Sequence, residues 1–243
     1  PLRDIDYQWV GRDAIAVAAV RAVMASEDQR FVEHHGIDFV SLDKALSAYR
    51  EGDELRGAST ITQQVAKNLF LWQGRSFVRK LLEAYFASLI EALWSKERIL
   101  EVYLNTAQFG SGYYGVEAAS RHFFGRPASK MNREQAALLA AVLPSPTRLH
   151  AEAPSAYLQS RRDWILGQMS SLGGVRYLDA LDAVPLQLRK HLLGEVQSCC
   201  GRGYGARLAR VDGLIAVAVF VLLGAVNVWR ERNVADFFQH RRY

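Results

Sequence analysis

The sequence predicts an all-α fold. Apolar residues recur at helical spacing through most of the first 172 residues, and capping residues and glycines separate the segments. No convincing run of alternating polar and apolar residues predicts a strand. Half of the 243 residues are hydrophobic and 23% are charged, so the chain can bury a core and wholesale disorder is excluded.

Seven helices are expected in chain order, with bounds set by apolar periodicity and by caps. They are residues 13–25, 38–49, 59–70, 77–94, 96–104, 133–143 and 155–172. The segment 77–94 is the clearest, because its apolar residues form one broad face. Ser59 or Thr60 can cap the third helix, and Asn132 with Gln135 resembles a capping box that opens the sixth.

The pattern changes after this helical region, which we expect to form one domain over residues 1–174. A connector follows over 175–212, then an uncharged apolar segment over 213–229 and a tail over 230–243. As a helix the apolar segment would span roughly 25 Å, near the lower limit for crossing a bilayer, so a membrane helix and a buried soluble helix are both open. Because the chain begins with Pro1, we expect an export signal or membrane anchor to precede it.

The net charge indicates the kind of partner that the chain can bind, and the cysteine content argues against a fold held by disulfides or zinc. The net charge of +5 and the pI of about 9.3 suit an anionic partner, which could be nucleic acid, an anionic membrane surface or a phosphorylated substrate. The only cysteines, Cys199 and Cys200, are adjacent and poorly placed to bridge. No disulfide framework and no zinc site is predicted.

Three polar clusters are the candidates for chemistry. The first runs from Glu27 to Gly36, where a carboxylate beside an aromatic ring suits acid–base work, although a solvated helix end is the simpler interpretation. The second is 57–64, whose hydroxyls and amides suit sugars, with Lys67 one turn further on; a well-capped helix start explains it equally. The third joins Arg75 to the segment 79–83, in which a structural i,i+4 ion pair and a diphosphate clamp are the alternatives.

Together and in this order, the clusters closely resemble the motifs of the family 51 peptidoglycan glycosyltransferases, most of all the monofunctional proteobacterial enzymes. The matching blocks are Glu27-Asp28-x-x-Phe31-x-x-His34-x-Gly36, Gly57-x-Ser59-Thr60-Ile61-Thr62-Gln63-Gln64, Arg79-Lys80-x-x-Glu83, Lys96-x-x-Ile99-Leu100-x-x-Tyr103-Leu104-Asn105 and Phe109-Gly110-x-Gly112-x-Tyr114-Gly115-Val116. The resemblance covers about residues 20–172, and the segment after about Asp182 matches nothing in the family.

The resemblance implies a lysozyme-like fold with a large lobe and a small, membrane-proximal lobe. It implies that Glu27 is the general base for the GlcNAc 4-hydroxyl of lipid II, which attacks a lipid-linked glycan strand with inversion and release of undecaprenyl diphosphate. Glu83 is the second catalytic residue, at the diphosphate end. The expected substrate-binding residues are Asp28, Phe31, His34, Ser59, Thr60, Gln63, Gln64, Lys67, Asn68, Arg75, Arg79 and Lys80.

The same resemblance sets the expected cofactors, partners and location. No cofactor is required, and a divalent cation, Mg²⁺ or Mn²⁺, at Glu83 is compatible with it. The partners are lipid II, the lipid-linked glycan, the inner membrane and proteins of cell-wall synthesis or division, and not nucleic acid. The domain is expected on the periplasmic face of a bacterial inner membrane. A glycan-cleaving muramidase or lytic transglycosylase and a non-catalytic assembly scaffold are the rival functions.

Overall fold

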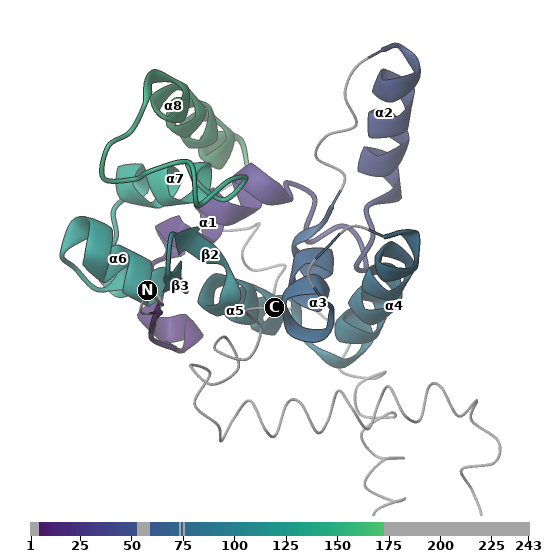
Figure 1. The fold of residues 1–243 in the computed structure, drawn as a ribbon, viewed down its shortest axis with the longest axis horizontal. Helices are drawn as coiled ribbons and strands as arrows, with labels where there is room; N and C mark the ends of the chain where they lie inside the picture. Colours follow the sequence, from purple (N-terminus) through teal and green to yellow (C-terminus); the bar gives the residue numbers. More distant parts are fainter. Residues whose placement is uncertain (1–4, 53–58, 73, 75, 173–243) are drawn as a thin grey trace, which may run out of the picture. The chain divides into compact units, whose positions relative to one another are not determined.

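The computed structural model describes residues 5–52, 59–72, 74 and 76–172, all within the first of two compact units of the chain, Pro1–Val184 (Figure 1). This part is mostly helical, as predicted. Its α-helices are α1 (Val17–Glu27), α2 (Phe39–Arg50), α3 (Ile61–Phe70), α4 (Phe77–Leu93), α5 (Lys96–Thr106), α6 (Val116–Phe124), α7 (Arg133–Ala141) and α8 (Ala156–Ser171). The predicted connector, apolar helix and tail over 175–243 lie outside the described residues.

Local capping sets where several helices begin. Thr60 caps α3, because its side-chain hydroxyl accepts from the backbone N–H of Gln63. The Gln63 side chain in turn accepts from the backbone N–H of Thr60. Asn132 and Gln135 form the same reciprocal capping box at α7. Each box satisfies two backbone donors that a helix start otherwise leaves unpaired, which confirms the starts predicted from these residue types.

A small sheet and one helix were not predicted. Strands β1 (Asp6–Tyr7), β2 (Gln108–Gly110) and β3 (Tyr113–Tyr114) pair in the order β1-β3-β2, so the expectation of no strands is wrong. Gly115 then turns the chain into α6 with φ of 83°, and a Cβ there would lie 2.9 Å from the Asn105 carbonyl oxygen. Such a position requires glycine, because an L side chain would be strained and would clash.

Two groups of helices meet around the end of α1. Helices α7 and α8 pack on each other and on α1, while α3 packs against α4 and α5 (Figure 1). The core between them includes the fully buried Met24, Phe31 and Tyr103. Helix α2 differs, since none of its residues is buried. No helix among the described residues is both long and apolar enough to span a bilayer.

Candidate active site

Glu27 is the last residue of α1, and its carboxylate is held from two sides. Oε2 accepts a hydrogen bond of 2.9 Å from the Gln64 side-chain amide on α3. Oε1 accepts one of 3.1 Å from the Ser26 hydroxyl and lies 3.9 Å from Nη2 of Arg161 on α8. The side chain is 14% exposed, so the carboxylate is oriented by its partners and still reaches solvent.

Tyr103 fixes the direction of that amide. Its buried hydroxyl lies 3.3 Å from Gln64 Oε1, which leaves the Gln64 NH₂ group to face Glu27. Burial raises the pKa of Tyr103 well above its ordinary value, and the negative charges of Glu27 and Asp28 raise it further. The phenol therefore keeps its proton and acts as the donor.

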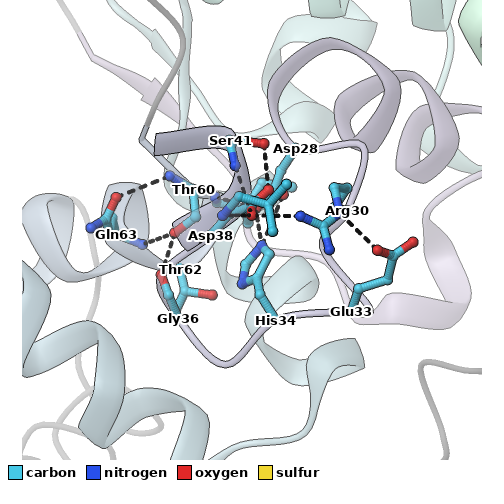
Figure 2. Close-up of polar contacts among 12 residues, drawn as sticks. Asp28, Arg30, Glu33, His34, Gly36, Asp38, Ser41, Thr60, Thr62 and Gln63 are labelled. Carbon is cyan, nitrogen blue, oxygen red and sulfur yellow. Dashed lines mark hydrogen bonds and ion pairs between the residues drawn. The ribbon is translucent and has the colours of Figure 1, made fainter. Parts of the chain in front are cut away.

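Asp28 ties the loop after α1 to the start of α3 (Figure 2). Its carboxylate accepts from His34 Nε2 at 2.9 Å and from the backbone N–H of Ile61 at 3.0 Å. A second link runs from the Thr60 hydroxyl to the Gly36 carbonyl oxygen at 2.6 Å. Gly36 has φ of 85°, a conformation that glycine adopts without strain. The loop and α3 are thus locked together next to Glu27.

Lys96 also holds this loop in place, through a buried set of polar contacts. Its buried ammonium donates to the His34 carbonyl oxygen at 2.6 Å and to Glu91 Oε1 at 2.7 Å, and it lies 4.3 Å from the centroid of the Phe31 ring. Glu91 also accepts from the Thr62 hydroxyl at 2.6 Å. Burial lowers the pKa of Lys96, while Glu91 and Asp28 raise it. This network joins the loop to α3, α4 and α5.

The cationic cluster consists of Lys67, Arg79 and Lys80 around Glu83. Glu83 is buried, with Oε2 accepting from Arg79 Nη1 at 3.0 Å and Oε1 accepting from the Lys80 ammonium. Lys80 also donates to the Ser59 hydroxyl at 3.0 Å. Lys67 interacts electrostatically with all three of these charged groups and with Glu27. The i,i+4 pair expected from the sequence is therefore present, as part of a larger and more buried set of charges.

A cavity of about 220 Å³ lies beside Glu27 and Asp28. Glu27 and Asp28 line one part of it, and Ser59, the hydrogen-bond partner of Lys80, lines another. Its lining is mostly polar, since hydroxyls and charged groups dominate. The lining residues are Ala25, Ser26, Glu27, Asp28, Gln29, Arg30, Asp38, Ser41, Ser59 and Thr60. The Glu27 carboxylate and a serine in contact with the cationic cluster thus line the same cavity.

The predicted site residues take different places around this cavity. Glu27, Asp28, Ser59 and Thr60 line it. Phe31 is fully buried and His34 nearly so, and neither lines the cavity. The other predicted residues on α3 and α4 are Gln63, Gln64, Lys67, Asn68, Arg79, Lys80 and Glu83. Arg75 lies outside the described residues.

Ser26, Tyr103 and Arg161 are site residues that the sequence did not single out. Tyr103 belongs to a block that matched the resembling family, so its presence in the motif was the available signal. Arg161 had none, because it is a helical arginine 134 positions from Glu27 that only folding brings within reach. No group of three or more His, Cys, Asp or Glu in the described ranges could hold a metal ion.

Comparisons with known proteins show the family to which the chain belongs. Residues 2–170 match the family model described as Transglycosylase. A biosynthetic peptidoglycan transglycosylase of Pseudomonas putida (strain W619) is 55% identical over 180 residues, covering 74% of this chain and 76% of the relative. Proteins of the same name from Marinomonas sp. (strain MWYL1) and Yersinia pseudotuberculosis are 57% and 56% identical over 169 and 171 residues, covering 70% of this chain and 75% and 71% of theirs. The chain belongs to the transglycosylase family.

Proposed function

We propose that this chain polymerises peptidoglycan glycan strands by transferring a lipid-linked glycan to the GlcNAc 4-hydroxyl of lipid II. The observation that carries the proposal is the cavity with Glu27 on its wall and with Ser59, the partner of Lys80, on another part of it. The names of the relatives support the same activity, since each is called a biosynthetic peptidoglycan transglycosylase. Membership in the transglycosylase family agrees with it.

The Glu27 carboxylate and the cationic cluster each take one part in the proposed reaction. Glu27 takes the proton of the acceptor 4-hydroxyl as that oxygen attacks C1 of the donor MurNAc. The bond from C1 to the diphosphate breaks in the same displacement, so the α-linked donor becomes a β-linked product. Negative charge then develops on the diphosphate, where Lys67, Arg79 and Lys80 provide fixed positive charge. Cations that are already in place stabilise such charge without reorganising.

A divalent cation at Glu83 does not fit the residues described here. Both carboxylate oxygens of Glu83 already accept from cationic side chains, Oε2 from Arg79 and Oε1 from Lys80. No step of the proposed reaction is therefore assigned to a metal.

Two incubations of the protein, one with lipid II and one with isolated glycan, distinguish glycan synthesis from glycan cleavage. With purified lipid II, we expect the protein to produce glycan polymer, visible as a ladder after electrophoresis. With isolated glycan strands, we expect no digestion. Digestion without polymer formation would favour a muramidase or lytic transglycosylase, and binding of lipid II with neither reaction would favour a scaffold.

Replacing Lys80 by methionine is expected to slow polymerisation by about 10²-fold, because one preorganised cation at the diphosphate is lost. Stability should fall by less than about 1 kcal/mol, since the Lys80 side chain is 47% exposed and Arg79 remains on Glu83. Single-turnover rates and urea unfolding measure the two effects. The matched control is the exposed Lys130, whose replacement by methionine should change neither. Equal rates for K80M and K130M would remove Lys80 from the diphosphate site.

An exposed apolar stripe on α2 supports association with the periplasmic face of the inner membrane. Phe39, Leu42, Leu46 and Tyr49 recur at helical spacing along one face and are 41–70% exposed. At the start of α4, Phe77 is 78% exposed. Patches of this kind mark interaction surfaces, and a lipid-linked substrate places the acceptor at a bilayer. We therefore propose that the α2 stripe contacts lipid.

Replacing both Phe39 and Leu46 by serine is expected to lower the fraction of protein bound to liposomes at least tenfold. Each side chain would lose roughly 1.5–3 kcal/mol of apolar burial on binding lipid. Co-sedimentation with vesicles containing anionic lipid measures the change. The matched control is Ser47→Asn, an exposed position of α2 outside the stripe, which should bind as the unchanged protein does. Retention of binding by the double variant would contradict the assignment.

A further inference from the structure

One flank of α8 carries an exposed tryptophan beside the partners of Glu27. Two residues of this flank reach the end of α1: Arg161 Nη2 donates to the Ser26 hydroxyl at 3.2 Å, and Gln168 Oε1 accepts from the Gln29 amide at 3.2 Å. Trp164 follows Arg161 by three positions and precedes Gln168 by four, so it shares their side of the helix. Trp164 is nevertheless 48% exposed.

The two exposed aromatic side chains of α8 both lie on this flank. Leu158, Ile165 and Met169 are buried on the adjoining face of α8 and hold it to the domain. Tyr157, one turn before Arg161, is 60% exposed and extends the flank. Two aromatic side chains are therefore partly exposed on the side of α8 that contacts residues 26–29. Those residues form part of the cavity lining.

Arg161 has donor capacity left at this place. Its side chain is 23% exposed, while its Nε is buried and has no hydrogen-bond partner among the described residues. An arginine carries five N–H donors in one plane, and native structures rarely leave such donors unused. The flank thus combines an exposed aromatic face with an arginine side chain that is partly open to solvent.

The flank lies on the side of Glu27 away from the cationic cluster. Oε2 of Glu27 is held by Gln64 on α3, the helix that also carries Lys67. Oε1 is the oxygen beside Ser26 and Arg161, toward α8. If the cations hold the diphosphate that leaves the donor, the sugar whose hydroxyl loses its proton to Glu27 approaches from the α8 side.

We propose that Trp164 stacks on the pyranose ring of the acceptor sugar, with Arg161 donating to an oxygen on the same sugar. This assignment rests on the proposed function and adds an acceptor subsite to it. A pyranose presents C–H groups on its faces and hydroxyls at its edge, so an aromatic ring next to planar N–H donors matches both. Trp164 is a binding residue in this assignment, and it takes no part in the proton transfer.

The test compares Trp164→Ala, Trp164→Leu and Trp164→Phe in lipid II polymerisation. We expect the alanine and leucine variants to raise the KM about tenfold with little change in kcat, because stacking is lost, and the phenylalanine variant to stay within about threefold of the unchanged protein. The matched control is Asp163→Asn, an exposed neighbour on α8 that points away from α1. It should leave both constants unchanged.

A binding measurement separates this inference from the proposed function. A soluble GlcNAc–MurNAc disaccharide is titrated while tryptophan fluorescence is recorded, with saturable quenching expected for the unchanged protein and its loss expected in Trp164→Phe. Absence of polymer from the unchanged protein would reject the proposed function, whatever the titration shows. Polymerisation with equal KM for the alanine and phenylalanine variants would overturn the subsite alone. A change in liposome binding or oligomeric state in Trp164→Ala, with KM unchanged, would likewise overturn it.

Discussion

Replacing Glu27 by glutamine is expected to lower the rate of glycan polymerisation by about 10²- to 10⁴-fold, the usual contribution of a general base. The amide keeps the size of the carboxylate but cannot accept the proton of the acceptor hydroxyl. The fold should persist, because Gln64 can still donate to the side-chain carbonyl oxygen and the Ser26 hydroxyl can rotate to accept from the new NH₂ group. Single-turnover assays with lipid II measure the rate.

The control for this variant is binding and stability at the same protein concentration. Glu27→Gln should bind lipid II within a few-fold of the unchanged protein and unfold at a similar urea concentration. A second variant, Glu27→Asp, retains the charge but withdraws it by one methylene, so it should be less impaired than the glutamine variant. Polymerisation by Glu27→Gln within a few-fold of normal would remove Glu27 from the reaction.

Replacing Lys96 by methionine is expected to destabilise the domain by about 3–5 kcal/mol. The change removes the cationic partner of Glu91, whose side chain is 5% exposed, and leaves that carboxylate with the Thr62 hydroxyl as a donor. It also removes the hydrogen bond to the His34 carbonyl. An uncompensated buried charge accounts for most of such a loss. The melting temperature should fall by roughly 6–20 °C for a domain of this size.

Two further variants separate lost charge balance from lost volume. Lys96→Met combined with Glu91→Leu should recover part of the stability, because a buried ion pair replaced as a whole by apolar groups is often tolerated. Lys130→Met, at an exposed lysine, should change the melting temperature very little. A Lys96→Met protein that melts with the unchanged one would show that the network contributes little to the fold.

The helices could be predicted because their signals are local. Thr60 with Gln63 and Asn132 with Gln135 lie three positions apart, and each box marks a helix start in the structure. The small sheet could not be predicted in the same way. Strands β1 and β3 are two residues long, too short for alternation to show, and they pair across more than a hundred positions.

The site was predictable only where residues form a motif along the chain. Glu27 and Glu83 stand in blocks that resemble a known family, whereas Arg161 reaches Glu27 from a distant helix with no local signal. The sequence also did not indicate which charged side chains are buried. Charged side chains are exposed by default, so nothing local indicated that Lys96 is 4% exposed or that Glu83 is 3% exposed.

A single displacement at C1, with Glu27 taking the proton, is tested most directly by the configuration of the bond that forms. Lipid II labelled with ¹³C at C1 of MurNAc begins as the α-linked diphosphate, and the anomeric signal is followed by NMR during polymerisation. We expect α signal to convert directly to β signal in the polymer, and the conversion to be lost in Glu27→Gln. An α-linked polymer would mean two displacements through a glycosyl-enzyme intermediate and would contradict the assignment of Glu27 as the base of a one-step transfer.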